Sequence, residues 1–535
     1  MSSVTRNVRF VLIGIALLLA VVFGPLRQSG TVELGSSLPR ASITVDARAA
    51  GPPISPYLYG VAVEWIDNGN VILDPKTRLL RPDLVDPLKA LRIPVWRFPG
   101  GILADHYHWR DGVGPPEGRP IGRNPMDDTE HVHAFGTDEF IALCRATGAA
   151  ALITANAGTG TQDEALAWQA HFAAEKFPVR YWEIGNEIYL AEDNDRPSIP
   201  GNDRTIFKTP DAYARLYVAW RAALRARDPA ALAGAIAGTA NTSAQNRGWL
   251  PTLLSTTAGE IDFIALHDAF APLILDPYDY GDRDNRRAAY ASMFARVQWT
   301  GEDIAEVKSR WTTARAGATT RIAITEHFPL FGGGGDQQQV RAILDQSRTL
   351  AAALYTASLF HEFMRREVWM ANYNIATGKW FGALLTDTES GIIKTPTYHV
   401  FDLYRNHFGT KMVGATVHGP HFETRQVGTV PARKAVPYLD VAASKDGTGG
   451  VYLAVINRSG DQPVDTDIHI AGTVSVDAAV MTLAGPLLEA INGPALGSTV
   501  QPNANIAILT STWNMRSGSN YRFPPASVTV FRWSM

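Results

Sequence analysis

Two glutamates follow short apolar segments that have the pattern of β-strands. Asn186 and Glu187 come directly after Val179–Gly185 in VRYWEIGNE, and Glu326 comes directly after Ile322–Thr325 in RIAITEHF. Retaining glycoside hydrolysis needs two carboxyl groups about 5 Å apart, one as general acid/base and one as nucleophile. The strands of a parallel barrel present such pairs at their carboxyl ends. The pattern therefore predicts a catalytic pair, and a surface carboxylate before a loop is the competing interpretation for Glu326.

Two charged residues accompany this pair. Glu183 has the same strand parity as Glu187, so it faces the same side but lies deeper, where a structural ion pair is its expected role. Arg97 ends the segment Pro94–Phe98, and an arginine at that position can keep a nucleophilic carboxylate ionised. A purely structural ion pair is the alternative for Arg97.

Other polar and aromatic residues stand at or after strand-like segments. His267 ends DFIALH and is either part of the site or a satisfied core histidine; Glu64 ends the first segment and can hydrogen-bond sugar hydroxyls. Trp109 either stacks on a sugar or packs in the core. Asp105, His106 and His108 have the composition of a metal site, but no second group stands at ligand spacing, so neither a metal nor an organic cofactor is predicted. No G-x-S-x-G motif supports an esterase.

Eight strand-like segments alternate with helical patterns in the first 408 residues. This alternation predicts a (β/α)8 barrel, because each strand needs a covering helix. A doubly wound open sheet is the other arrangement, but no glycine-rich phosphate loop follows an early strand. Gly332–Gly335 is expected to be a flexible loop on the active-site face. The predicted strands are Tyr57–Val63, Pro94–Phe98, Ala149–Ala155, Val179–Gly185, Leu232–Gly238, Ile261–Leu266, Ile322–Thr325 and Glu367–Ala371.

Beyond about Tyr404 the helical pattern stops and strand patterns take over. Residues 409–535 are predicted to form an all-β, jelly-roll-like sandwich, with strands near Tyr452–Val455, Val464–Ile470, Val474–Thr482 and Ser527–Trp533. The domain organisation is therefore 1–40 as targeting segment and linker, 41–408 as catalytic barrel and 409–535 as sandwich. A strand near 41–48 is expected to join the sandwich.

The N-terminus has the character of an export signal. Arg6 and Arg9 precede an apolar run over residues 10–26, which is short for a membrane span and lacks a good cleavage site. We expect an exported chain at a periplasmic or extracellular face, either anchored by this segment or released from it.

Composition excludes some partners and functions. The net charge of −3 over 535 residues and the absence of a basic, aromatic-rich patch argue against nucleic acid. The single cysteine, Cys144, excludes an internal disulfide framework, and its helical apolar context predicts a buried, inert thiol. The sequence leaves the oligomeric state open.

Longer phrases resemble those of a known family. The chain from 41 to 535 resembles glycoside hydrolase family 51 of clan A, the α-L-arabinofuranosidases. The phrases are ISPYLYGVAVE, WRFPGGILADHYHWRDGVGP, YWEIGNE and KTPTYHVFDLYRNHF, followed in the sandwich by PYLDVAAS, LAVINRSGDQPV and FPPASVTVFRW.

The resemblance implies a barrel with a sandwich and a retaining mechanism acting on a carbohydrate substrate. It implies that Glu187 is the acid/base and Glu326 the nucleophile. It also implies that Asn186 binds the hydroxyl next to the anomeric carbon, that Arg97 lies under the nucleophile and that Glu64 holds distal hydroxyls. His267 matches the family's sixth-strand histidine.

Several sugar-facing positions depart from the family pattern. They are Ile102 after PGG, Ala269 after the sixth-strand histidine, His327 after the nucleophile, and Asn372 or Asn374 in place of an eighth-strand glutamine. The expected function is that of an α-L-arabinofuranosidase. A related clan member acting on another sugar, such as a β-xylosidase, β-glucuronidase or endoglucanase, is the nearest alternative. A non-catalytic carbohydrate-binding protein and an envelope structural protein are alternatives of other classes.

Overall fold

The chain was analysed as a computed structural model. It describes residues 39–124, 129–189, 208–239, 248–274, 276–332, 337–378, 382–472, 474–497, 499–515 and 519–534. The apolar segment 10–26 and residues 333–336 of the glycine-rich loop lie outside the described residues. Within them, no helix is long and apolar enough to cross a membrane.

Eight parallel strands close into a barrel. Neighbours pair in chain order, and the pairing of β11 with β9 and of β12 with β2 closes the ring, which excludes an open doubly wound sheet. Each of the eight predicted segments overlaps one barrel strand. The strands are β2 (Gly60–Ala62), β3 (Val95–Phe98), β6 (Ala150–Ala155), β7 (Tyr181–Ile184), β8 (Leu232–Ile236), β9 (Phe263–Leu266), β11 (Ile322–Leu330) and β12 (Met370–Tyr373).

Two barrel strands, β2 and β12, begin three residues later than the sequence predicts. Pro56–Tyr59 forms a 3-10 helix before β2, since Ser55 caps it and Pro56 has no N–H to give to a strand. Before β12, Glu367 has a positive φ of 51° at the end of a helix. Strand pairing therefore starts only where the backbone becomes extended.

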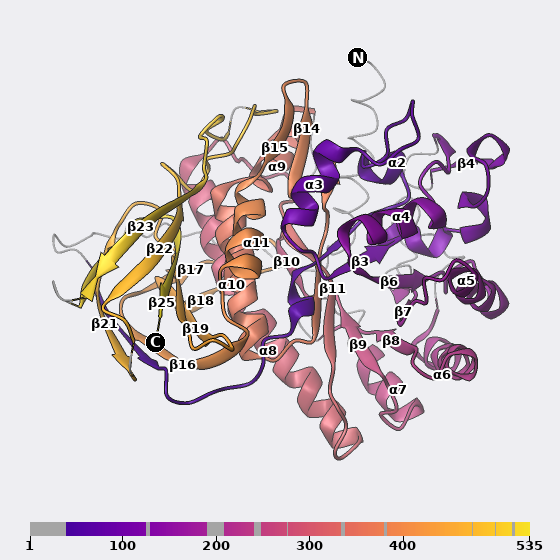
Figure 1. The fold of residues 1–535 in the computed structure, drawn as a ribbon, viewed down its shortest axis with the longest axis horizontal. Coiled ribbons are helices and arrows are strands. Elements are labelled where there is room, and N and C mark those ends of the chain that lie inside the picture. The colour runs from indigo at the N-terminus through magenta and orange to yellow at the C-terminus, as the bar shows by residue number, and fades with distance from the viewer. Residues whose placement is uncertain are drawn as a thin grey trace.

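Helices cover the outside of the barrel (Figure 1). Several start at a side-chain cap that accepts a backbone N–H, for example Thr161 before α5 and Thr209 before α6. The helices are α2 (Asp67–Asn70), α3 (Pro82–Ala90), α4 (Thr137–Thr147), α5 (Gln162–Ala174), α6 (Pro210–Arg227), α7 (Trp249–Thr256), α8 (Arg283–Ala314), α9 (Gln337–Gln346), α10 (Leu350–Arg365) and α11 (Pro396–Asn406). Cys144 lies buried on α4, where burial raises the pKa of its thiol.

Short strands decorate the barrel. β10 (Ala269–Pro272) pairs with the second half of β11 and extends the sheet at its carboxyl end. The hairpin β4 (Ile121–Arg123) and β5 (Glu130–Val132) lies after β3. The small sheet β13 (Thr377–Gly378), β14 (Leu385–Thr388) and β15 (Gly391–Lys394) follows β12.

A second nine-stranded sheet folds into two layers around its own apolar core. β16 joins the layers, because its first three residues pair with β19 and residues 414–418 pair with β1. β1 (Arg40–Asp46) thus belongs to this sheet although it precedes the barrel in sequence. The other members are β16 (Lys411–His418), β19 (Leu439–Lys445), β20 (Val451–Asn457), β21 (Val464–Ala471), β22 (Asp477–Ala484), β23 (Ile508–Asn514), β24 (Asn520–Phe523) and β25 (Ser527–Trp533), with β17 (His421–Thr424) and β18 (Arg433–Pro437) as a separate hairpin.

Candidate active site

The carboxyl end of β7 carries Asn186 and Glu187 on a sharp turn. Gly185 and Glu187 both have positive φ, of 79° and 44°, so the chain leaves the strand direction at once. Asp105, from the loop after β3, accepts the backbone N–H of Asn186 at 2.7 Å and those of Ala157 and Gly158 at 2.9 Å. Burial raises the pKa of Asp105 to about 7 despite these three donors. One side chain thereby ties the ends of β6 and β7 together.

Arg97, at the end of β3, is fully buried and contacts three side chains. Its Nε donates to Glu183 Oε2 at 2.8 Å, its Nη1 to Glu326 Oε2 at 3.0 Å and its Nη2 to Asn186 Oδ1 at 2.6 Å. The guanidinium therefore binds the predicted nucleophile Glu326 and the residue that precedes Glu187. Glu183 takes part in an ion pair, which is the role that strand parity predicts for it.

Glu326 lies on β11 with both carboxylate oxygens held. Besides the bond to Arg97, Oε1 accepts from Asn374 Nδ2 at 3.0 Å. Burial raises the pKa of Glu326, and the cations His267 and Arg97 act against this rise. The carboxylate is thus a buried anion with donors on each oxygen, an arrangement suited to a nucleophile.

His267, just after β9, lies between the two glutamates. Its Nδ1 is 2.9 Å from Glu187 Oε1 and 3.9 Å from Glu326 Oε2, while Nε2 is 3.0 Å from Thr325 Oγ1. Burial lowers the pKa of His267, but the charges of Glu187, Glu183 and Glu326 outweigh burial and raise it to about 9. The surrounding carboxylates therefore favour the protonated form of the imidazole.

This shared contact limits the separation of Glu187 and Glu326. Their two oxygens cannot lie further apart than the sum of their distances to Nδ1, 2.9 and 3.9 Å. Retaining enzymes place the carboxyl groups about 5–5.5 Å apart, and inverting enzymes about 6.5–9.5 Å apart. This limit admits the separation of retaining enzymes and excludes all but the lower end of the inverting range.

Further polar groups surround the pair. Asn70 fixes Glu64 by accepting its backbone N–H at 2.6 Å and donating to Oε2 at 3.2 Å, and burial raises the pKa of Glu64 to about 8. Among the described residues, Asn186 Nδ2 and Asn374 Oδ1 are buried without a hydrogen-bond partner. Such atoms are available to the hydroxyls of a sugar.

The residue that contacts the nucleophile from the carboxyl end of β12 is Asn374, directly after the strand. Asn372 is one pleat deeper, beside Gly60, where both its amide atoms are buried without a partner in the described part of the chain. Residues two apart on a strand face the same side, so the sequence signal at Asn372 could also have indicated Asn374 as a residue of the site. Nothing in the sequence distinguished Asp105, Asn70 and Thr325 as supports of the site.

Trp109 packs away from the carboxylates. It is 7% exposed, its ring stacks on Trp168 at 6.4 Å, Arg110 covers it at 4.6 Å, and its Nε1 donates to the carbonyl of Glu164. The packing interpretation of Trp109 therefore fits the structure better than sugar stacking.

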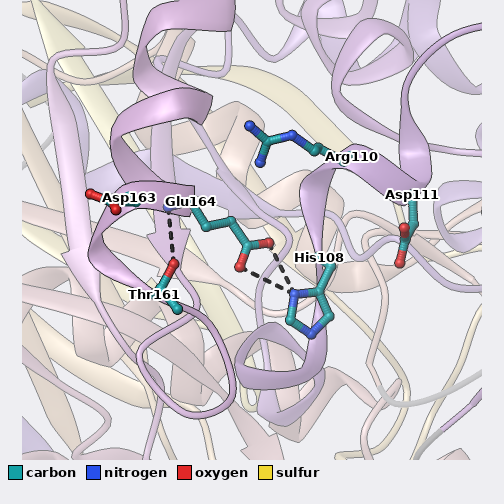
Figure 2. Close-up of a pocket in the computed structure, with 6 residues that line it drawn as sticks. All are labelled: His108, Arg110, Asp111, Thr161, Asp163 and Glu164. Atoms are coloured by element: carbon teal, nitrogen blue, oxygen red, sulfur yellow. Dashed lines mark hydrogen bonds and ion pairs between the residues drawn. The ribbon is translucent and has the colours of Figure 1, made fainter.

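A polar surface depression adjoins this region at the ends of β3 and β6. It is lined by His108, Arg110, Asp111, Thr161, Asp163 and Glu164. Figure 2 shows the Glu164 carboxylate bound to His108, with Arg110 and Asp111 lying apart from them. Glu183, Glu187, Thr325 and Glu326 surround His267, and none of them lines this depression. Within the described residues, no group of three or more His, Cys, Asp or Glu side chains is arranged to hold a metal ion.

Three of the residues that depart from the family pattern have apolar or aromatic surroundings. His327 lies among Phe360, Phe363 and Tyr373, and burial lowers its pKa to about 3, so its imidazole is neutral. Ala269 is buried, and Phe270 stands edge-on to His267 at 6.2 Å. Ile102 is half-buried and packs against the barrel core.

Known proteins similar to this chain include α-L-arabinofuranosidases. The family model of the α-L-arabinofuranosidase C-terminal domain matches residues 332–527, and that of the α-L-arabinofuranosidase 1 domain matches residues 87–175. The probable α-L-arabinofuranosidase C of Aspergillus niger is 27% identical over 500 residues, which cover 88% of this chain and 90% of the relative. An intracellular exo-α-L-arabinofuranosidase of Bacteroides ovatus is 25% identical over 86% of this chain and 90% of the relative.

A solved structure of the same kind superposes on nearly the whole chain. The α-L-arabinofuranosidase of Thermotoga maritima, in complex with arabinose, has a TM-score of 0.73 and 26% identity, over 92% of this chain and 99% of that one. Both domain models and the full-length similarity agree with the barrel and the sandwich. The chain is thus a glycoside hydrolase that is similar, over nearly its whole length, to the α-L-arabinofuranosidases of family 51.

Proposed function

We propose that this protein is a retaining α-L-arabinofuranosidase in which Glu326 is the nucleophile and Glu187 the acid/base. The observation that carries the assignment is the contact of both carboxylates with His267 Nδ1, at 2.9 and 3.9 Å. The arabinofuranoside substrate is supported by the names of the relatives and of the matching domain models.

The reaction proceeds in two displacements. A carboxylate oxygen of Glu326 forms a bond to the anomeric carbon while the bond to the leaving oxygen breaks, and Glu187 gives its proton to that oxygen. Glu187, now ionised, then takes a proton from water. The resulting hydroxide oxygen bonds to the anomeric carbon, and Glu326 is released as a carboxylate. Arg97 and Asn374 hold Glu326 before and after each displacement.

Two residues are positioned to hold the sugar. Asn186 has its Oδ1 bound by Arg97, so its Nδ2–H is free to donate to the hydroxyl next to the anomeric carbon. Glu64, whose pKa is raised to about 8, is protonated at neutral pH and can donate as well as accept. Asn372 lies deeper and would serve a group that reaches the barrel floor.

The substrate is tested with matched aryl glycosides. Purified protein is assayed on 4-nitrophenyl α-L-arabinofuranoside, β-D-xylopyranoside, β-D-glucuronide and β-D-glucopyranoside. We expect kcat/KM for the arabinofuranoside to exceed the others by at least tenfold. A pyranoside as the best substrate overturns the sugar assignment, and the absence of turnover on all four overturns the enzymatic one.

The roles of the two carboxylates are tested by azide rescue. On an arabinofuranoside with a good leaving group, azide should accelerate Glu187→Ala and give a glycosyl azide of retained configuration. With Glu326→Ala, any rescued product should have inverted configuration. A retained product from Glu326→Ala means that the roles are reversed.

For the N-terminus, we infer that residues 10–26 direct export of the chain and can anchor it. The support is compositional: Arg6 and Arg9 precede an uninterrupted apolar run. Cell fractionation of the full chain and of a variant lacking residues 1–26 tests this. Equal retention of both chains inside the cell contradicts it.

A further inference from the structure

Glu183 lies inside the barrel on β7, beneath Glu187, and is fully buried. One of its oxygens, Oε2, is bound by Arg97 Nε and by Thr154 Oγ1, both at 2.8 Å. The other, Oε1, faces His267 Nε2 at 3.7 Å. The ion pair with Arg97 occupies only Oε2, so the direction of Oε1 toward the imidazole calls for a separate explanation.

His267 has three carboxylates around it in the described structure. Glu187 and Glu326 approach Nδ1, and Glu183 approaches Nε2. The remaining groups against the ring, Thr325 and Phe270, are uncharged. Asp268, the next residue in the chain, is bound by Arg296 at 2.7 Å and is neutralised there. Glu183 is the one carboxylate of the three that takes no part in the proposed bond changes.

The charge cluster of the site consists of Arg97, Glu183, Glu187, His267 and Glu326. Its positive and negative charges are equal in number in both stages of the reaction when Glu183 is included. Before the first displacement, Glu187 is protonated, and the cations Arg97 and His267 face the anions Glu183 and Glu326. After it, Glu326 is esterified and uncharged, and Glu187 is the second anion. Without Glu183 one cation is in excess at both stages, and an uncompensated buried charge is costly.

We propose that Glu183 is a positioning residue that keeps His267 protonated on both ring nitrogens, so that Nδ1–H donates to Glu187 throughout the reaction. This role rests on the functions proposed for Glu187 and Glu326. The same attraction acts on Glu183 itself: burial raises its pKa, and Arg97 and His267 outweigh burial and lower it to about 2. Glu183 therefore stays ionised while Glu187 gains and loses its proton.

The protonation of His267 is measured directly in the wild-type chain. Nitrogen-15 shifts of labelled histidines are followed from pH 5 to 10, and the His267 signal is assigned from its loss in His267→Gln. We expect both ring nitrogens of His267 to remain protonated at pH 7.5. A neutral His267 at that pH overturns the proposal, whether or not any Glu183 variant folds.

The contribution of Glu183 is measured with a charge-removing and a charge-keeping variant. Loss of a nearby negative charge lowers the pKa of every proton-binding group beside it. In Glu183→Gln we therefore expect the His267 titration to move down by at least one unit. In a plot of kcat/KM against pH, both the acidic and the basic limb should shift to lower pH. Glu183→Asp should keep the limbs near their wild-type positions.

A matched control is Glu362→Gln on α10. Glu362 is a buried glutamate whose ion pairs are with Arg365 and Arg366 and not with His267. The Glu362→Gln variant should be less stable than wild type, but both limbs of its profile of kcat/KM against pH should keep their wild-type positions. If Glu183→Gln and Glu183→Asp shift the limbs equally, or if Glu183→Gln lowers only the melting temperature, Glu183 is merely structural.

The two proposals fail in different ways. Absence of arabinofuranoside hydrolysis by the wild type contradicts the proposed function and leaves the histidine titration to be judged by itself. Normal hydrolysis with an unshifted His267 in Glu183→Gln contradicts only the role of Glu183.

Discussion

At the residue scale, opposing effects set the ionisation of Glu326. Burial and the neighbouring Glu187 raise its pKa, and His267 and Arg97 lower it, with a net rise. A nucleophile must be ionised, so activity should fall as the pH drops through this raised value rather than through the ordinary value of 4.5. Groups that donate to Glu326 thus control the acidic side of the pH profile.

Asn374→Ala removes the donor on Glu326 Oε1. A hydrogen bond to a charged group is worth about 1.5–3 kcal/mol, which corresponds to a roughly 10–100-fold lower kcat if it acts in the displacement. Steady-state kinetics on 4-nitrophenyl α-L-arabinofuranoside measure the loss. Asn374→Asp should move the acidic limb upward, because a second carboxylate beside Glu326 disfavours its ionised form. A kcat within twofold of wild type in Asn374→Ala contradicts this role.

At the scale of elements, the loop after β3 holds the carboxyl ends of β6 and β7. The Asp105 side chain is the acceptor for three backbone N–H groups there, including that of Asn186. The position of Glu187 thus depends on a loop that lies more than 80 residues earlier, as the Asp105–Asn186 sequence separation of 81 shows. Barrel enzymes place catalytic groups at this end of the strands and stabilising contacts at the other.

Asp105→Ala should lower both stability and kcat, because three buried N–H groups lose their acceptor and the Asn186–Glu187 turn loses its anchor. Each unsatisfied buried donor costs about 1–3 kcal/mol, less where water enters. Denaturant unfolding and kinetics are measured on the same sample.

The control for Asp105→Ala is Asp262→Ala. Asp262 precedes β9 at the amino end of the strands and accepts the N–H of Ala233 at 2.9 Å, together with Arg221. The Asp262→Ala variant should be less stable than wild type and should keep the wild-type kcat. If both variants lose stability and neither loses kcat, Asp105 does not position the turn.

At the scale of the molecule, α10 and α11 lie between the barrel strands and the second sheet (Figure 1). Asp440 of β19 joins the two parts. Its carboxylate accepts from Arg458 Nη2 at 2.6 Å, pairs with Arg365 of α10 and lies 3.3 Å from His361 Nδ1. Burial raises the pKa of Asp440, but the two arginines outweigh it and hold the pKa well below its usual range. The sheet is thereby fixed to the helix that follows β11.

Asp440→Asn should destabilise the whole chain by about 3–5 kcal/mol, because it leaves the buried Arg458 without its counter-charge. Differential scanning calorimetry measures the change, with activity per folded molecule expected to stay near wild type. Asp465→Asn, which removes an exposed pair with Arg522, is the control and should change stability far less. Equal effects of the two variants contradict a special role for the interface.

Acid should unfold the protein through these same carboxylates. Glu183 and Asp440 have lowered folded pKa values, so their stabilisation is present above the ordinary values of 4.5 and 3.8 and is lost as the pH falls toward the folded ones. The melting temperature should drop steeply between about pH 4.5 and 2. Glu183→Gln and Asp440→Asn should each have a shallower drop than wild type. If the melting temperatures of wild type, Glu183→Gln and Asp440→Asn fall in parallel as the pH drops, these two carboxylates are not the origin of the acid sensitivity.

The sequence by itself determined the eight barrel strands, the later strands of the second sheet and the two glutamates at strand ends. These features are local: alternation, capping residues and turn residues act over a few positions. It also indicated Arg97 and His267, because a polar residue ending an apolar strand stands out. It could not choose between stacking and packing for Trp109, nor distinguish Asn372 from Asn374.

The tertiary structure decided which polar groups meet. Arg97, Glu183, His267 and Glu326 come from four different barrel strands or their ends, and their contacts exist only because β11 pairs with β9 to close the ring. The same pairing brings Thr325 to His267, whereas Asp105 acquires its role by binding the adjacent ends of β6 and β7. Side-chain chemistry and strand period can be read along a chain, but distances of about 3 Å between residues far apart in sequence are fixed only by the packed fold.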